Sequence, residues 1–131
     1  MKSTNVADQQ VASSLSKESE TVLSRHLSSF ANHDLESLMD DYTEQSVLIT
    51  QDAVFLGVKE IRRFFIDLLK HFPKHQSNFV LDKQVVDDEL GFIVWHGATP
   101  SLEVPLGTDT FIVKKGKIHR QTFAGQLNFL V

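Results

Sequence analysis

The chain has 131 residues, of which 41% are hydrophobic and 23% charged, with 17 acidic against 13 basic side chains and a net charge of −4. This composition is typical of one globular domain, and the scattered basic residues form no stripe that could follow a nucleic-acid backbone. The absence of cysteine excludes disulfides, a thiol nucleophile and a zinc–thiolate site.

No apolar stretch reaches the roughly 20 residues that span a bilayer, and residues 1–16 lack the apolar core of a signal peptide. We therefore expect a cytoplasmic protein that binds neither membranes nor nucleic acids. Residues 1–17, rich in Ser, Gln and Asn, predict a flexible or partly helical N-terminal extension. Residues 18–131 predict a single domain.

Apolar residues recur at helical spacing in the first part of this domain. The first helix is predicted from residue 19 onward, with an apolar stripe made of Val22, Leu23, Leu27, Phe30 and Ala31. Asp34 is a suitable N-cap for a short second helix. A third helix is predicted at 58–72, where the i, i+3, i+4, i+7 pattern is the clearest in the chain and Pro73 ends it.

The second part of the domain is predicted to be strands. Short β-like runs at 46–49 and 53–56 precede the third helix. After residue 76 come two runs at 79–86 and 92–98 and a long hairpin that ends near residue 127. Helices followed by consecutive strands predict an α+β fold with a mostly antiparallel sheet.

The long hairpin carries a carboxylate on an apolar face. Lys115-Gly116 is its predicted two-residue turn, because Gly tolerates the positive φ of tight hairpins. Side chains alternate along a strand, so Asp109 shares a face with Phe111 and Val113. A buried carboxylate is costly unless it is compensated, which makes Asp109 a candidate for chemistry. Exposure near a strand end is the alternative.

Pairing Val113 with Ile118 would place Arg120 and Thr122 on the face of Asp109. Both residues are therefore candidate ligand contacts. A salt bridge from Arg120 is an alternative partner for the carboxylate, because buried charges usually occur in pairs.

The helices can cover only one face of such a sheet. The other face would carry residues such as Ile112 and Phe123. An uncovered apolar face suits either a homodimer interface or simple exposure to solvent.

His26 lies four residues after Val22 and four before Phe30, within the apolar stripe of the first helix. If His26 and Asp109 both point inward, the carboxylate would hold the imidazole in one tautomer and favour its protonated form. The pair could then act as a general acid or base. A purely structural His–Asp hydrogen bond is the alternative.

Trp95 and His96 are neighbours on a predicted strand, so a regular strand sends only one of them inward. Trp95 inside would form an apolar wall for a flat ligand, and His96 inside would add a titrating group.

We predict no metal site: His71 and His75 have i, i+4 spacing, but Pro73 lies between them and ends the helix.

The order of these elements is distinctive, as are the Asn-His-Asp-Leu break at 32–35, Thr-Asp-Thr-Phe at 108–111 and Lys-Gly-Lys-Ile at 115–118. Over roughly residues 18–127 the chain resembles the SnoaL-like branch of the nuclear-transport-factor-2-like, or ketosteroid isomerase-like, superfamily. The resemblance implies a cone in which three N-terminal helices pack in a curved sheet around an internal pocket. It also implies chemistry without a cofactor. Members include isomerases, polyketide cyclases, dehydratases and non-catalytic domains, so the fold does not determine the activity.

The resemblance also implies roles for single residues. Asp109 falls at the position of a protonated Asp that donates to an oxyanion in ketosteroid isomerase, and His26 falls at the position of its oxyanion-hole Tyr. Thr50 occupies the position of the general base, and Asp52 follows two residues later. A Thr hydroxyl does not abstract a carbon-bound proton at neutral pH, so we do not expect ketosteroid isomerase activity itself.

We therefore predict a pocket for a small apolar organic molecule, with His26 and Asp109 as catalytic residues. The predicted ligand contacts are Thr50, Asp52, Trp95, His96, Phe111, Arg120 and Thr122. The competing hypothesis is a non-catalytic ligand carrier or dimeric interaction module. In that case the pocket would be filled by Phe30, Phe64, Phe65, Trp95 and Phe111.

Overall fold

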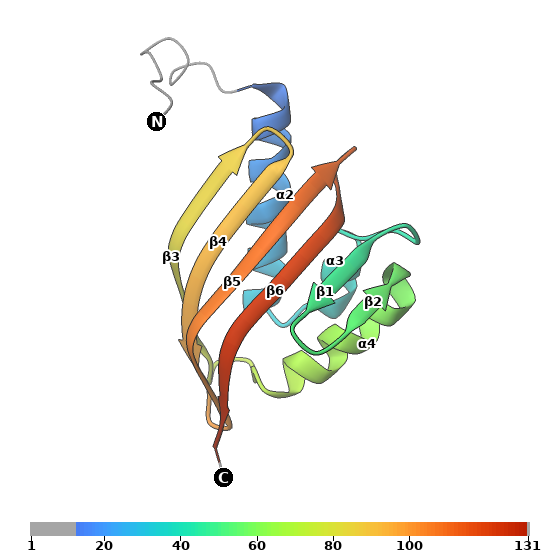
Figure 1. Cartoon of the computed structure of the whole chain (residues 1–131). Helices are drawn as coiled ribbons and strands as arrows, with labels where there is room; N and C mark the ends of the chain where they lie inside the picture. Colours follow the sequence, from blue (N-terminus) through green and yellow to red (C-terminus); the bar gives the residue numbers. More distant parts are fainter. Residues whose placement is uncertain (1–12, 131) are drawn as a thin grey trace.

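The computed structural model describes residues 13–130, which form a curved sheet with helices packed against one face (Figure 1). Its elements are α2 (Ser14–Ala31), α3 (Leu35–Met39), β1 (Val47–Thr50), β2 (Val54–Leu56), α4 (Gly57–Lys70), β3 (Asn78–Asp87), β4 (Leu90–Ala98), β5 (Leu102–Lys114) and β6 (Lys117–Phe129). Most of the predicted N-terminal extension lies outside the described residues. Within them, no helix has the length and apolar character needed to cross a bilayer.

The first two of these helices begin at capping side chains. The hydroxyl of Ser13 accepts a hydrogen bond from the backbone N–H of Ser16 (2.9 Å) at the start of α2. The carboxylate of Asp34 accepts one from the N–H of Ser37 (3.2 Å) at the start of α3, as predicted. The helices therefore begin where the local chemistry satisfies their free N–H groups.

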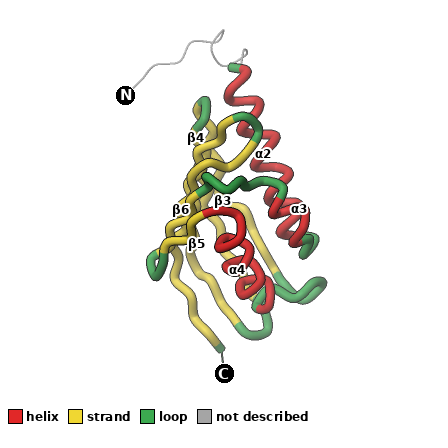
Figure 2. Tube along the Cα trace, turned by 90° about the vertical axis from the view of Figure 1, so that its right-hand side faces the viewer, coloured by secondary structure: helices red, strands yellow, loops and turns green. Residues whose placement is uncertain are grey.

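The sheet has the strand order β2-β1-β6-β5-β4-β3. Only the β1–β6 pair is parallel among the described strands, and the other neighbours are antiparallel. Figure 2 shows α2, α3 and α4 on the same side of the sheet. The predicted α+β fold with a mostly antiparallel sheet is confirmed, and the opposite, convex face is left uncovered by the described elements.

The β5–β6 hairpin turns at Lys115 and Gly116, as predicted. Their φ angles are 52° and 73°, and positive values at both central residues are typical of a type I′ turn. Val113 pairs with Ile118, also as predicted. The turn and the first pair of this hairpin could therefore be read from the sequence.

The register shifts directly beyond this pair. Ile112 pairs with Arg120, so His119 is the extra residue of a β-bulge. Because a shift by one residue exchanges the two faces of a strand, β6 presents the opposite set of side chains from the one predicted.

The bulge overturns three predictions about β6. Arg120 and Thr122 are exposed and do not share the face of Asp109. Phe123, which was expected on the outer face, is buried beside Gln121. The buried side chains of β6 are therefore those of Ile118, Gln121 and Phe123, and none of them is a cation.

Candidate functional site

A small cavity lies between α2, α4 and the concave face of the sheet. Its volume is about 40 Å³, several times the roughly 10–15 Å³ that one water molecule requires. Most of its wall is aromatic or aliphatic, and the polar side chains in the wall are His26, Trp95, Asp109 and Gln121. An apolar hollow with a few convergent polar groups is the arrangement expected of a small-molecule site.

Asp109 is buried in this wall and is held by two neutral donors. Its Oδ1 accepts a hydrogen bond from Trp95 Nε1, and its Oδ2 accepts one from Gln121 Nε2, both at 2.9 Å. Tyr42 in turn donates its hydroxyl hydrogen to Gln121 Oε1. Burial raises the pKa of Asp109, and the two hydrogen bonds and nearby His26 only partly oppose it.

His26 is enclosed by aromatic rings and bonded to a different carboxylate. Its ring lies edge-on to Tyr42, Phe65 and Phe111, with centroid separations of 5.5–5.9 Å. Its Nδ1 lies 3.2 Å from Oδ2 of Asp41, a side chain with no exposed surface. A carboxylate only accepts hydrogen bonds, so Nδ1 carries a proton. Among the described residues, Nε2 has no hydrogen-bond partner.

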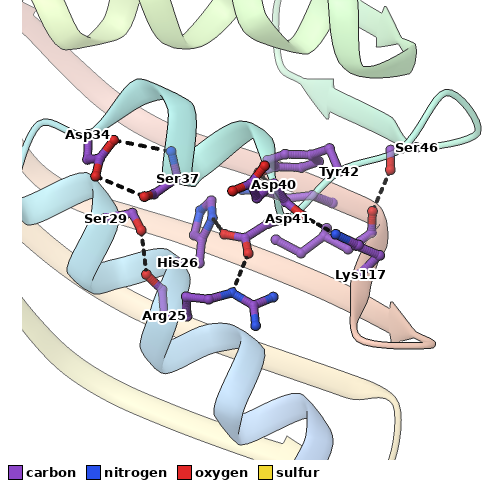
Figure 3. A network of polar contacts seen from close by, with 12 residues as sticks. Arg25, His26, Ser29, Asp34, Ser37, Asp40, Asp41, Tyr42, Ser46 and Lys117 are labelled. Carbon is purple, nitrogen blue, oxygen red and sulfur yellow. Dashed lines mark hydrogen bonds and ion pairs between the residues drawn. The ribbon is translucent and has the colours of Figure 1, made fainter.

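Asp41 also binds an arginine (Figure 3), and this arginine contacts the hairpin turn. Arg25 Nε donates to Asp41 Oδ1 at 2.8 Å, and its Nη2 donates to the carbonyl of Gly116 at 3.2 Å. Glu18 accepts from the N–H of Gly116 at 2.8 Å. Arg25 thus supplies the cation that buried Asp41 needs, and α2 positions the turn between β5 and β6.

The structure does not pair the two predicted catalytic residues with each other. His26 is bonded to Asp41, and Asp109 is bonded to Trp95 and Gln121. Arg120 is no partner for Asp109 either, because it donates to the carbonyls of Gln45 and His119 on the surface. His26 and Asp109 nevertheless line the same cavity.

No protein-family model and no curated protein matches the sequence. Several solved structures resemble the fold. A candidate ketosteroid isomerase from Kribbella flavida is 10% identical, with a TM-score of 0.71 over 88% of this chain and 83% of that one. An NTF2-like protein of unknown function from Mesorhizobium loti is 16% identical, with a TM-score of 0.73 over 88% and 97%.

A third similar structure is a candidate SnoaL-like polyketide cyclase from Shewanella denitrificans, 14% identical with a TM-score of 0.65 over 82% of this chain and 90% of that one. The chain has the NTF2-like fold. At such identities the likeness establishes the fold alone, and the activity must be argued from the side chains.

On this NTF2-like fold the predicted ligand contacts fall into two groups. Trp95 and Phe111 line the cavity. The remaining five lie outside its lining: Thr50, Asp52, His96, Arg120 and Thr122. β4 turns Trp95 inward, so His96 faces outward, where its Nδ1 lies 2.7 Å from Asp82 Oδ2.

Thr50 has a structural role on the NTF2-like fold. The Thr50 hydroxyl accepts hydrogen bonds from the N–H groups of Asp52 (3.2 Å) and Ala53 (3.1 Å) in the turn between β1 and β2. This hydroxyl is therefore occupied in shaping a turn, and Asp52 is exposed.

Sequence analysis missed two residues of the site, Asp41 and Gln121. Asp41 lies three residues after Leu38 and directly before Tyr42, so helical spacing places it beside the apolar face of the short helix. That position could have marked it as a buried acid. Gln121 was missed because the bulge at His119 reverses the faces of β6.

Proposed function

We propose that the cavity binds a compact, largely hydrophobic organic molecule and that His26 transfers a proton on it without a cofactor. The observation that carries this proposal is the state of the imidazole: its Nδ1 is bound to buried Asp41, and its Nε2 is the nitrogen left for a ligand. The reaction would be of the isomerase, cyclase or dehydratase type.

His26 would act as the general base. Nε2 takes a proton from the ligand, the imidazole becomes positively charged, and the Asp41 carboxylate stabilises that charge. The same proton then returns to a second atom of the ligand, so no external acceptor is needed. Asp41 is a positioning residue in this scheme, because it acts only through His26.

Asp109 would stabilise the negative charge that develops on the ligand during the reaction. A carboxyl whose pKa is raised by burial can be present in its protonated form, which donates a hydrogen bond to an oxyanion. Its neighbours allow this change. Without a ligand, the Gln121 amide can turn over so that its oxygen accepts the new proton and its nitrogen donates to the Tyr42 hydroxyl, which both accepts and donates. With a ligand bound, Asp109 would donate this proton to the oxyanion instead.

The names of the similar structures support this reaction class, since they include a candidate ketosteroid isomerase and a candidate polyketide cyclase.

The proposed function is tested by the thermal stabilisation that a panel of small cyclic ketones and phenols induces. We expect stabilisation of the wild type that is weakened in both His26→Ala and Asp109→Asn but unchanged in Asp82→Asn, a surface control. Equal stabilisation in all four proteins would remove His26 and Asp109 from the site.

The size of the cavity favours a second candidate function, a non-catalytic carrier or interaction domain. A volume of about 40 Å³ does not hold a drug-sized ligand unless the aromatic walls move. Phe30, Phe64, Phe65, Trp95 and Phe111 all line it. Ligand stabilisation that survives in His26→Ala, with no conversion of the ligand by the wild type, would favour this candidate.

We further propose that the protein forms a homodimer through the convex face of the sheet. On the neighbouring strands β1 and β2, Ile49, Val54 and Leu56 are 44–60% exposed. A second copy would remove this apolar surface from water, a contribution of roughly 25 cal/mol per Å². The dimer does not depend on whether the cavity is catalytic.

A further inference from the structure

A second hollow lies next to the cavity, between the end of α2 and the loop that joins α4 to β3. Its volume is about 170 Å³. The wall combines three Phe side chains with the loop residues Lys74, His75 and Ser77. It is therefore apolar on its inner side and polar toward solvent.

Phe30 and Phe79 line both hollows, so these two rings form the wall between them. Their centroids are 6.1 Å apart. Both side chains are half-buried, in contrast to the buried Phe65 and Phe111 deeper in the cavity. Side-chain rotations of this kind are fast in partly exposed residues, and rotation of either ring would join the two hollows.

The outer hollow carries positive charge. Lys74 and His75 are exposed on its lip, and among the residues described Lys74 makes no ion pair. The neighbouring acid is Asp34, whose carboxylate is already engaged by the N–H (3.2 Å) and hydroxyl (2.8 Å) of Ser37. The Lys74 ammonium helps to lower the pKa of Asp34 from nearby, but it forms no ion pair with that carboxylate, so its N–H groups remain available to a ligand.

The loop holds these two side chains in place. Its carbonyl at Pro73 accepts hydrogen bonds from the N–H of Gln76 (3.2 Å) and the hydroxyl of Ser77 (2.8 Å). His75 adopts a positive φ of 68° inside this turn. A closed turn of this kind presents Lys74 and His75 at its tip.

We propose that the outer hollow is the mouth of the cavity, gated by Phe30 and Phe79, and that it binds the carboxylate of an amphipathic ligand whose apolar end enters the cavity. This inference rests on the small-molecule binding proposed above and adds the class of ligand. The opposite orientation is disfavoured, because a carboxylate inside the apolar cavity would lose its water and would meet no Lys or Arg side chain in the lining.

The test compares two probes of the same shape, 4-phenylbutyrate and 4-phenyl-1-butanol. Trp95 is the only tryptophan and lines the cavity, so its fluorescence reports binding of both. An exposed ion pair contributes about 0.2–1 kcal/mol, so we expect the acid to bind roughly one and a half to five times more tightly than the alcohol. Lys74→Gln should abolish this preference.

The matched control is Lys70→Gln, at the end of α4 just before this loop, because Lys70 lies near Asp67 (3.6 Å) and does not line the hollow. It should leave the preference for the acid intact. Phe79→Ala should speed the association of both probes, since it removes one ring of the gate.

The outcomes of these experiments separate the proposed carboxylate site from the proposed small-molecule cavity. Equal binding of acid and alcohol to the wild type, or an equal loss of both in Lys74→Gln, overturns the carboxylate site and leaves the apolar cavity standing. Unchanged association rates in Phe79→Ala overturn the gate. If neither probe changes the fluorescence of Trp95 or the melting temperature, the inference fails together with the small-molecule site on which it rests.

Discussion

Among residues 13–130, two carboxylates are buried, those of Asp41 and Asp109, and their partners differ in charge. Asp41 is bonded to the Arg25 guanidinium and to His26, whereas Asp109 is bonded only to the neutral groups of Trp95 and Gln121. A cation offsets the loss of hydration of a carboxylate far better than neutral donors do. Burial without a cationic donor therefore favours the protonated form of Asp109, which suits it to donate a hydrogen bond.

Replacing Asp109 with Asn tests its raised pKa. Because the native pKa lies above the unfolded value of 3.8, the native state binds the proton more tightly. The wild type should lose stability as the pH rises from about 4 through the native pKa. Asp109→Asn has no carboxyl to titrate at this position. Over that pH range its free energy of unfolding should therefore fall less than that of the wild type.

Urea denaturation at a series of pH values measures this difference. The Asn side chain can keep the bond from Trp95, and Gln121 can turn to accept from its amide, so the variant should fold. Stability curves that run parallel from acid to neutral pH would show that burial does not disfavour the charged form of Asp109.

Replacing Asp41 with Asn tests the anchor of His26. The change leaves the Arg25 cation without its carboxylate and weakens the bond to the imidazole. The Arg25 side chain is 45% exposed, so the guanidinium left behind stays hydrated, and the expected loss is that of hydrogen bonds to a charged group, about 1.5–3 kcal/mol. Asp40→Asn is the matched control, because that neighbouring side chain is exposed and should change stability by less than about 0.5 kcal/mol. Equal stability of the two variants would contradict the role of Asp41.

Strand alternation predicted the burial of Asp109, because it depends only on two neighbouring apolar residues of the same strand. Its partners could not be predicted in the same way. They come from β4 and β6, so they depend on which of Trp95 and His96 faces inward and on the register of β6.

At the scale of elements, the bulge at His119 decides what the cavity contains. The two-residue turn and the pair Val113–Ile118 were predictable, because Gly in a short polar turn is a local signal. The bulge has no comparable local signal. It follows from tertiary packing, which buries Phe123 against Trp95 with ring centroids 5.9 Å apart.

Deleting His119 tests this account of the hairpin. Without the extra residue, a regular register would turn Arg120 and Thr122 into the core and Gln121 and Phe123 out of it. We expect loss of cooperative unfolding, measured by circular dichroism on heating. His119→Ala keeps the chain length and should melt cooperatively near the wild-type temperature. A deletion variant that unfolds like the wild type would contradict the assigned register.

At the scale of the molecule, the helices lie on one side of the sheet (Figure 2), and the apolar side chains of Ile49, Val54 and Leu56 are exposed on the other. Light scattering after size-exclusion chromatography should therefore give twice the chain mass of 14.8 kDa. Ile49→Lys adds a charge to the convex face and should shift the mass toward the monomer. Glu20→Lys on the exposed side of α2 should not. A monomer mass for the wild type would rule out the dimer.

Catalysis at this site would require that the imidazole of His26, held by Asp41, offer its free nitrogen to the apolar cavity. Nitrogen-15 NMR of the histidine side chains tests it most directly, with His26 assigned by comparison with His26→Ala. We predict that neutral His26 carries its proton on Nδ1 and that 4-phenyl-1-butanol shifts the Nε2 resonance. A proton on Nε2, or an Nε2 signal that stays fixed while Trp95 fluorescence shows the probe bound, would contradict this arrangement.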